Sequence, residues 1–192
     1  MKITIIGNGN IGSGLASVLA QAGHEVSALD RNDDIASAVA GAETVILATP
    51  YGAAAELAGQ ADFSGKVVID VSNPVNADFS GLQVGHTSSA AEEIASLLPG
   101  SKVVKAFNTI FAQHYASGLK VAGQPLQTFV ASDDEAAREI VKQLATDIGL
   151  VPVDAGPLKN ARYLEPLGFM NIQFGYVLGR GVNIAPQWLS AE

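Results

Sequence analysis

Short apolar runs alternate with longer stretches of helical periodicity along almost the whole chain. The short runs are bounded by Gly, Pro, Asn or Asp, which is typical of buried strands. They predict strands at residues 2–6, 25–29, 44–48, 66–71, 102–107, 127–131 and 150–154. The longer stretches predict helices at residues 11–22, 34–40, 51–60, 88–98, 133–148 and 159–178. Within the last helix, Pro166 predicts a kink or a restart.

Strands that alternate with helices in this way predict the fold class. They favour an α/β protein with a Rossmann-type, doubly wound, mostly parallel sheet and a small C-terminal helical extension. The long loop at residues 73–86 is rich in Gly and Asp, and loops of this length are usually functional or mobile.

Composition narrows the classes of ligand and partner. Hydrophobic residues make up 48% of the 192 residues, which excludes a disordered chain, and the low charged fraction of 16% predicts that a partner or ligand covers part of the surface. The formal net charge of −8 disfavours nucleic acid and anionic membranes as partners. With no cysteine, and with His24, His86 and His114 scattered, we expect no metal site. The chain shows no signal peptide and no apolar run of membrane-spanning length, so we expect a cytoplasmic protein.

A glycine motif follows the first predicted strand directly and opens the first predicted helix. It consists of Gly7, Asn8, Gly9, Asn10, Ile11 and Gly12. Here Gly7 permits a tight turn, Gly9 lets a pyrophosphate approach the backbone, and Gly12 lets the helix pack close to the sheet. The helix N-terminus then offers N–H groups to the phosphates, whereas the alternative is a glycine-rich turn without a ligand. We therefore predict an NAD(P)-binding Rossmann domain at residues 1–155, and a C-terminal helical segment at 156–192 that serves dimerisation or the substrate cleft.

The residues that end the second strand bear on the choice of dinucleotide. An acid such as Asp30 accepts hydrogen bonds from the adenosine ribose and favours NAD, whereas Arg31 would attract the 2′-phosphate of NADP. Asn32 completes this stretch of candidate cofactor-binding residues. Because Asp30 favours NAD and Arg31 favours NADP, the spacing leaves the choice between the two dinucleotides open.

Polar and small residues follow the third, fourth and fifth strands, where ligands of such sheets lie. The candidate cofactor-binding residues there are Ala48, Thr49, Pro50, Asn73, Pro74, Ala106, Phe107 and Asn108. Ala106 leaves room for a flat nicotinamide, and Asn108 and Thr109 offer hydrogen bonds to its carboxamide or to a second substrate. For any one of these polar residues the alternative to contact with a ligand is a role in a loop turn or a helix cap.

The sequence offers no acid–base pair, so we expect no catalytic side chain. Hydride transfer between two redox cofactors needs only stacked rings and excluded water.

Five segments carry a resemblance to a known family. They lie at residues 7–16, 68–74, 88–94, 103–109 and 154–168, and the most specific are Lys-Ala-Phe-Asn-Thr and Gly-Pro-Leu-x-x-Ala-Arg-x-Leu-Glu. The chain resembles the coenzyme-F420-dependent NADP oxidoreductase family, which includes the F420H2:NADP oxidoreductases. Its cofactor-binding module is also similar to the cytoplasmic domain of the STEAP metalloreductases.

The resemblance implies a homodimer that binds NADP(H) and passes hydride between the nicotinamide and a deazaflavin. It implies that the nicotinamide side is lined by Thr49, Pro50, Asn73, Ala106, Phe107 and Asn108. The family commonly has Ser or Thr, then Arg, then a second basic residue after the second strand. Here only Arg31 matches, so the resemblance leaves NAD(H) open beside NADP(H).

Two classes of function remain. The first is an NAD(P)-dependent oxidoreductase whose second redox cofactor is coenzyme F420, by resemblance, or a flavin. The second is a non-catalytic dinucleotide-binding redox sensor or reductase subunit.

In the C-terminal helix, Arg162 and Glu165 are three residues apart and are expected to pair with each other. Four large apolar residues of this helix are expected in a dimer or domain core rather than in a substrate platform: Phe169, Met170, Phe174 and Tyr176.

Overall fold

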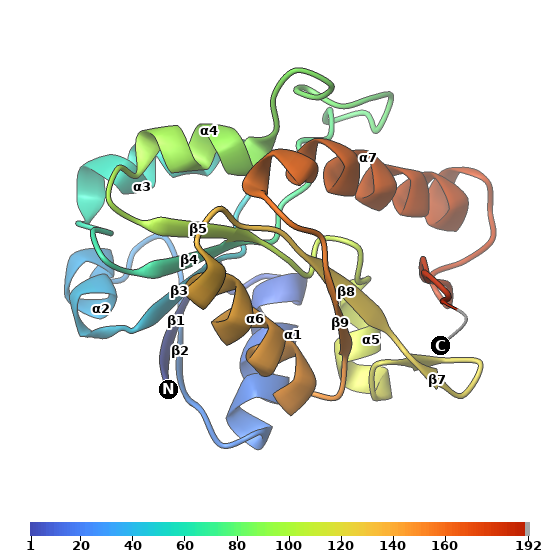
Figure 1. Cartoon of the computed structure of the whole chain (residues 1–192), viewed down its shortest axis with the longest axis horizontal. Coiled ribbons are helices and arrows are strands. Elements are labelled where there is room, and N and C mark those ends of the chain that lie inside the picture. The colour runs from blue at the N-terminus through green and yellow to red at the C-terminus, as the bar shows by residue number, and fades with distance from the viewer. Residues whose placement is uncertain (191–192) are drawn as a thin grey trace.

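The computed structural model describes residues 1–190, so residues 191–192 of the predicted C-terminal segment lie outside the described part. A sheet of five parallel strands forms the centre, in the order β2-β1-β3-β4-β5 (Figure 1). The strands are β1 (Lys2–Ile6), β2 (Glu25–Leu29), β3 (Thr44–Leu47), β4 (Val67–Asp70) and β5 (Lys102–Lys105). Because β3, β4 and the inner part of β5 are buried on both faces, their side chains are apolar in near-continuous runs.

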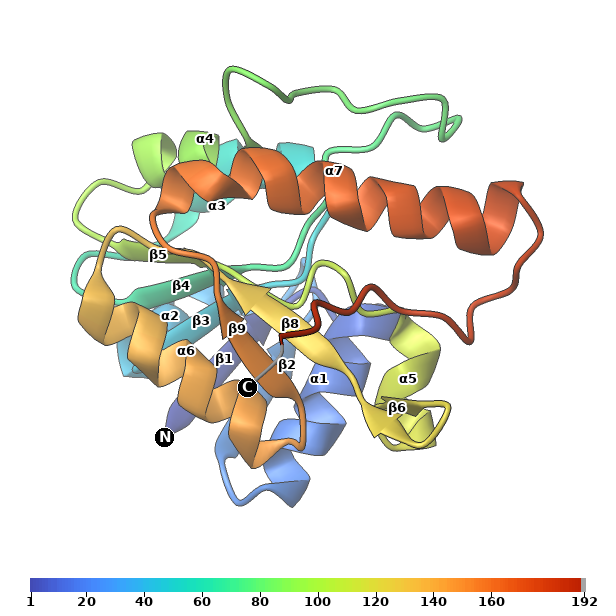
Figure 2. The same cartoon turned by 45° about the vertical axis from the view of Figure 1, so that its right-hand side comes forward.

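Helices cover both faces of this sheet. One face carries α1 (Asn10–Gln21), α5 (Ala112–Ser117) and α6 (Glu135–Asp147). The other carries α2 (Ile35–Gly41), α3 (Ala54–Gln60) and α4 (Ala90–Leu97), with a 3-10 turn at Tyr51–Ala53 before α3. Figure 2 shows α1 and α6 on one side of the sheet and α4 on the other. The predicted Rossmann-type, doubly wound α/β fold is confirmed.

Two further strands continue the architecture beyond β5. The strands β8 (Gln127–Val130) and β9 (Val151–Asp154) pair in parallel with each other and are joined by α6. In residues 1–190 their backbone pairing with the main sheet consists of one antiparallel bridge, in which Lys105 and Ala131 exchange backbone hydrogen bonds of 2.9 and 3.0 Å. The pattern of apolar residues predicts neither α5 nor the hairpin of β6 (Lys120–Val121) and β7 (Gln124–Pro125).

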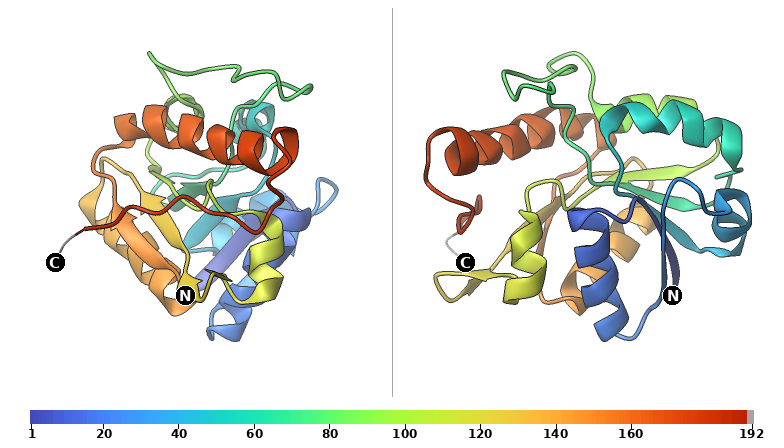
Figure 3. Two further views of the ribbon diagram at one scale, coloured as in Figure 1. Left: turned by 90° about the vertical axis from the view of Figure 1, so that its right-hand side faces the viewer. Right: turned by 180° about the vertical axis from the view of Figure 1, so that it is seen from behind.

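The C-terminal segment lies on the α4 side of the sheet. A 3-10 turn at Leu158–Asn160 leads into α7 (Ala161–Ile172), which runs through Pro166 into a π-helical turn at Gln173–Val177. The predicted restart at Pro166 is wrong: the helix continues, although a proline cannot donate the backbone bond of that turn. The chain then returns beside β8, where Gln127 and Trp188 share hydrogen bonds of 2.9 and 2.6 Å (Figure 3). No helix in residues 1–190 has the length and apolar character that a membrane span requires.

The strand order places one edge of the sheet in position for a ligand. The chain crosses from β1 to β2 on one side and later to β3 on the other, so the connections diverge above β1 and β3. Ligands of open α/β sheets bind at such a switch point, outside the carboxyl ends of the strands. The long loop at residues 73–86 and helix α7 both lie over this edge (Figure 2).

Candidate cofactor and substrate site

The turn between β1 and α1 depends on two glycines for its shape. Gly7 has a φ of +105°, and a Cβ atom there would overlap the carbonyl oxygen of Ala48 at the end of β3. A Cβ atom at Gly12 would overlap the carbonyl oxygen of Gly7. Both positions therefore require glycine, because the helix begins in direct contact with the turn and with β3.

Gly9 is open where the other two glycines are crowded. A Cβ atom at Gly9 would meet nothing within 4 Å, although the residue lies at the N-cap of α1. No side chain caps this helix, so the N–H groups of its first turn are free to bind an anion. The turn fits a pyrophosphate, since space and donors lie together at the positive end of a helix dipole.

A first cavity of about 420 Å³ extends from this turn toward β2 and α3. Asp30 and Arg31 line it from the end of β2, and Glu56 and Gln60 line it from α3. The Asp33 carboxylate accepts a 2.7 Å hydrogen bond from the Asp30 backbone N–H, which fixes the turn after β2. This cavity has the position that an adenosine would take beside the phosphate turn.

A second cavity of about 470 Å³ extends the other way, over the ends of β4 and β5 to α7. It shares Gly9, Ala48, Thr49 and Pro50 with the first cavity. Among the described residues that line it, none carries a Lys, Arg, His, Asp or Glu side chain. Its aromatic lining comes from Tyr51, Phe79, Phe107, Phe111 and Tyr176.

Three residues that line the second cavity each have a buried side-chain oxygen without a hydrogen-bond partner in residues 1–190. Ser72 Oγ, Asn108 Oδ1 and Thr109 Oγ1 form no hydrogen bond there. Their residues are 8%, 7% and 3% exposed. Buried polar atoms are normally paired, so three such atoms around one cavity indicate that a ligand or water supplies the missing bonds.

The ends of β4 and β5 are joined by a pair of asparagines. Asn108 Nδ2 donates to Asn73 Oδ1 at 2.9 Å and to the Leu164 carbonyl of α7 at 2.8 Å, and Asn73 Nδ2 donates to the Asn108 carbonyl at 2.7 Å. A Cβ atom at Gly168 would overlap the Asn73 side chain, so glycine lets α7 approach this pair closely. Phe107, which precedes Asn108, has a φ of +61°, and its N–H donates to Thr128 Oγ1 at 2.9 Å. This left-handed residue turns the chain so that Asn108 lies over the sheet edge.

Beneath the asparagines lies a cluster of buried charges. Lys105 Nζ lies 2.7 Å from Asp70 Oδ2 and 2.9 Å from Glu165 Oε1, and none of the three side chains is more than 1% exposed. Lys105 also donates to the Ser72 carbonyl at 2.5 Å. The Glu165 carboxylate accepts from the first amides of α4, at Ala90 and Ala91, and burial raises the pKa of Glu165. The cluster joins β4, β5, α4 and α7 directly under the site.

The predicted pairing of Arg162 with Glu165 is wrong. Arg162 forms two hydrogen bonds of 2.7 and 2.8 Å with the Glu92 carboxylate of α4, and this contact lowers the pKa of Glu92. Glu165 lies on the buried side of α7, where it contacts Lys105 and the N-terminus of α4, whereas Arg162 is only half-buried and contacts Glu92. The three-residue spacing indicates neighbouring positions on the helix, but the partners of Arg162 and Glu165 depend on the elements that pack against α7.

The structure brings most of the predicted cofactor residues to the two cavities. The following line one or both: Gly7, Gly9, Asn10, Ile11, Asp30, Arg31, Ala48, Thr49, Pro50, Asn73, Phe107 and Asn108. Five others do not line them: Asn8 and Asn32 are exposed, and Gly12, Pro74 and Ala106 are buried. Ala106 is fully buried among core side chains, and its neighbour Phe107, which is also buried, lines the second cavity. The roles of all these residues in binding stay predictions.

Several lining residues were not predicted from the sequence. Glu56 and Gln60 belong to a helix that was recognised but not connected with the site. Tyr51 directly follows Pro50, and this adjacency was the available signal; its hydroxyl donates to Glu93, which raises the pKa of Tyr51 to about 12. Asn171 and Tyr176 come from the C-terminal segment, and periodicity alone does not show that they reach the sheet edge.

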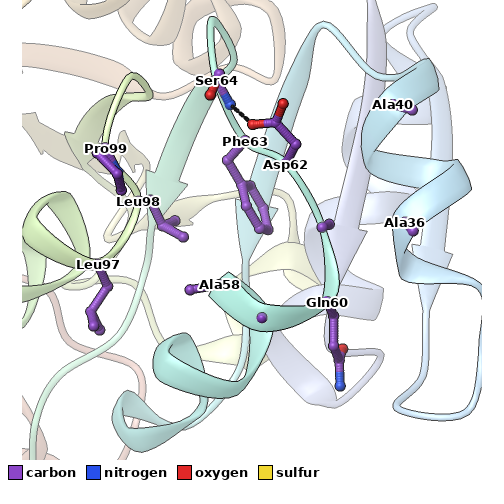
Figure 4. Close-up of a pocket in the computed structure, with 12 residues that line it drawn as sticks. Ala36, Ala40, Ala58, Gln60, Asp62, Phe63, Ser64, Leu97, Leu98 and Pro99 are labelled. Carbon is purple, nitrogen blue, oxygen red and sulfur yellow. Dashed lines mark hydrogen bonds between the residues drawn. The ribbon is translucent and has the colours of Figure 1, made fainter.

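A third cavity lies away from these two. It measures about 610 Å³ and lies near the amino ends of β4 and β5, at the opposite edge of the sheet (Figure 4). Small and apolar side chains form most of its wall, including Ala36, Ala58 and Leu97. The Asp62 carboxylate in its wall accepts from the Ser64 N–H at 2.9 Å and thus serves the local turn. The open N-terminus of α1 and the unpartnered side-chain oxygens of Ser72, Asn108 and Thr109 lie at the other edge.

Comparison with known proteins agrees with this geometry. Residues 2–61 match the family model of the 3-hydroxyacyl-CoA dehydrogenase NAD binding domain. A crystal structure described as an F420-dependent NADP reductase of Arthrobacter sp. FB24 is 28% identical, with a TM-score of 0.84 over 95% of this chain and 96% of that one. A reductive aminase of Aspergillus terreus, in complex with NADPH and ethyl levulinate, has a TM-score of 0.66 over 93% of this chain and 62% of that one; at 16% identity it shows the fold alone.

Curated relatives are longer proteins. Metalloreductase STEAP3 of Rattus norvegicus is 31% identical over 183 residues, which cover 86% of this chain and 36% of the relative. Metalloreductase STEAP2 of Homo sapiens is 37% identical over 103 residues, which cover 54% of this chain and 19% of the relative. The chain thus spans about a third or less of these relatives. The resemblance predicted from the five sequence segments is confirmed.

Proposed function

We propose, from the confirmed resemblance to the coenzyme-F420-dependent NADP oxidoreductase family, that this chain is an NAD(P)-dependent oxidoreductase. It transfers a hydride between the nicotinamide of a bound dinucleotide and a second redox cofactor, coenzyme F420 or a flavin. The Arthrobacter protein described as an F420-dependent NADP reductase supports this acceptor, and the rat metalloreductase supports reductase chemistry in general.

One observation carries the proposal. The two cavities meet at the phosphate turn, and the second cavity is lined by Ser72, Asn108 and Thr109, each of which has a buried side-chain oxygen without a hydrogen-bond partner in residues 1–190. A dinucleotide placed over the turn would put its adenosine in one cavity and its nicotinamide in the other. When bound, the nicotinamide supplies or receives the hydride.

The residues of the chain bind the dinucleotide, orient its reacting ring and exclude water from it. The α1 amides beyond Gly9 hold the pyrophosphate. Asn108 and Thr109 offer hydrogen bonds that orient a carboxamide or a second ring. The aromatic lining of the second cavity excludes water from the reacting ring. With no acidic or basic side chain among the described residues that line this cavity, these residues act on hydride transfer through positioning.

The test measures binding of NADH and NADPH, and then hydride transfer to coenzyme F420 and to FMN by absorbance. The informative variant is Thr109→Val, which removes an unpartnered hydroxyl and keeps the side-chain volume. We expect an unchanged melting temperature and a fall in kcat/KM of about five- to tenfold, the effect of one lost hydrogen bond.

The matched control is Thr128→Val, whose lost hydroxyl accepts the Phe107 N–H in the wild type. This variant should lose stability, because a buried donor is left unpaired. Unchanged cofactor binding and unchanged kcat/KM in Thr109→Val would contradict the placement of the nicotinamide or its acceptor in the second cavity.

The alternative is a dinucleotide-binding redox sensor or reductase subunit without turnover of its own. It is favoured by the observation that the chain spans only 36% of the rat metalloreductase, whose remaining length lies outside this similarity. Tight dinucleotide binding without hydride transfer to any tested acceptor would select this alternative.

We also propose that the chain forms a homodimer, as the resemblance implies. Large apolar side chains are exposed on α7 and the turn that follows it: Tyr163, Met170, Tyr176, Val177 and Leu178. Such a concentration of exposed apolar side chains is typical of an interface. Light scattering should give twice the chain mass, and Leu178→Asp should shift the mass toward one chain, whereas the control Leu97→Asp on α4 should not. A wild-type protein of single-chain mass would contradict the proposal.

A further inference from the structure

We propose that the adenosine cavity selects a ribose with a free 2′-hydroxyl, so that this chain uses NAD(H) in preference to NADP(H). The inference rests on the proposed dinucleotide binding and specifies it further. It departs from the expectation set by the resemblance, since the relatives described above include an NADP reductase.

Three ionisable side chains line the adenosine cavity. Asp30 and Glu56 are acidic and Arg31 is basic, and they come from the end of β2 and from α3. The sequence indicated a conflict between one acid and one base, and the structure adds a second acid from a different element. The balance of charge at the cavity is therefore negative before any ligand binds.

Asp30 is placed to accept hydrogen bonds from a ribose. It directly follows β2, and its backbone N–H is bound by the Asp33 carboxylate at 2.7 Å, so the turn that carries it is fixed. No ion pair within residues 1–190 involves the Asp30 carboxylate. A carboxylate at this position accepts from the ribose hydroxyls of NAD and repels a 2′-phosphate.

Glu56 is held on the opposite wall. It lies in the first turn of α3, and Gln60, one helical turn further on, donates to its carboxylate at 3.1 Å. Both side chains line the cavity, so the Glu56 carboxylate adds a second negative charge to its wall. A phosphate bound between β2 and α3 would face carboxylates from both sides.

Arg31 does not reverse this balance. It is exposed, and within residues 1–190 its guanidinium forms no ion pair that would fix its position. A phosphate monoester carries about −1.5 to −2 charges at neutral pH. Against two carboxylates and one guanidinium it gains one attraction and meets two repulsions, each worth roughly threefold per unit charge in water at about 6 Å.

The experiment measures dissociation constants of NADH and NADPH by calorimetry for the wild type and for single-charge variants. We expect the wild type to bind NADH roughly tenfold more tightly than NADPH. Asp30→Asn should narrow the ratio of the NADPH and NADH dissociation constants about tenfold. It should also weaken the binding of NADH, because the amide accepts ribose hydrogen bonds less well. Glu56→Gln should narrow the ratio by about five- to tenfold, with little effect on the affinity for NADH.

Glu25→Gln is the matched control. It removes one negative charge from the first residue of the same strand, at the opposite edge of the sheet, and should leave the ratio unchanged. If both dinucleotides bind and the wild type favours NADPH, or if Asp30→Asn leaves the ratio unchanged, the inference is overturned while dinucleotide binding stands. If neither dinucleotide binds, the proposed function fails as well.

Discussion

Gly9 and Gly12 lie three residues apart in one turn, yet a methyl group would act differently at the two positions. At Gly9 it would meet nothing within 4 Å, whereas at Gly12 it would overlap the Gly7 carbonyl. Gly9→Ala should therefore keep its melting temperature and lose dinucleotide affinity, because the methyl group occupies the pyrophosphate space. Gly12→Ala should lose stability itself, by more than about 2 kcal/mol, as overpacked backbone contacts do.

Thermal melts and dinucleotide titrations of the two variants check this pair. The binding affinity should fall in Gly9→Ala, and the free energy of unfolding should fall in Gly12→Ala. Full affinity in Gly9→Ala would mean that the pyrophosphate does not lie on the α1 N-terminus.

Lys105 neutralises two buried carboxylates, so its removal should be costly. Lys105→Met keeps the length of the side chain but leaves Asp70 and Glu165 buried without a cation. We expect a loss of about 3–5 kcal/mol in the free energy of unfolding, measured by urea denaturation. The control is Lys102→Met in the same strand. The 3.4 Å contact of Lys102 with Asp134 is partly exposed, so this variant should lower the free energy of unfolding by less than about 1 kcal/mol.

The Glu92–Arg162 pair predicts a pH dependence. The contact lowers the pKa of Glu92 in the folded state, so its stabilisation is present above the ordinary value of 4.5 and is lost as the pH falls through the lowered pKa. Glu92→Gln should thus destabilise the fold by about 1 kcal/mol at neutral pH. The difference from the wild type, measured by denaturation at several pH values, should shrink in the acid range. A constant difference would show that the charge of Glu92 is not responsible.

At the scale of single residues, the sequence located the glycine turn and most of the predicted residues around it, but it missed several other residues that line the two cavities. The glycines were recognisable because their spacing directly follows a strand and opens a helix. Glu56 and Glu165 were not connected with the site, because their roles depend on contacts with residues distant along the chain. Helical spacing places a residue on a face but does not identify the element opposite.

Among the elements, α7 depends on a close approach to the sheet edge at Gly168. A Cβ atom there would overlap the Asn73 side chain, which pairs with Asn108. Gly168→Ala should displace α7 or break the asparagine pair. We expect a lower kcat/KM and a loss of about 1–3 kcal/mol in stability.

Gly59→Ala in α3 is the control for this variant, since a Cβ atom at Gly59 meets nothing within 4 Å. It should be neutral or slightly stabilising, because alanine favours the helix. Equal behaviour of the two variants would show that the contact between α7 and Asn73 does not matter.

All seven long strands were predicted, because buried parallel strands read as short apolar runs between turn residues. The sequence did not show that β8 and β9 form a separate pair joined to β5 by one bridge, since apolar runs do not encode which strands are neighbours. The short α5 was missed because its N-cap is Phe111, which gives no capping signal.

For the whole molecule, the net charge of −8 predicts a salt dependence. Self-repulsion destabilises the compact state, and raising the salt from 0.01 M to about 0.15 M shortens the screening length from about 30 Å to about 8 Å. The melting temperature should rise over this range at neutral pH. Near the isoelectric point of about 4.7 the effect should nearly vanish, and a salt effect of equal size there would rule out self-repulsion as its cause.

The buried cluster of Lys105, Asp70 and Glu165 also constrains how this chain can diverge. The three residues are 35 and 60 positions apart in sequence, on β4, β5 and α7. A mutation at any one leaves an unbalanced charge in the core, so it is tolerated only if a compensating change occurs elsewhere in the cluster. Descendants of this gene should therefore keep or exchange the three as a set, while the exposed residues that line the first cavity, such as Arg31 and Glu56, vary independently of them.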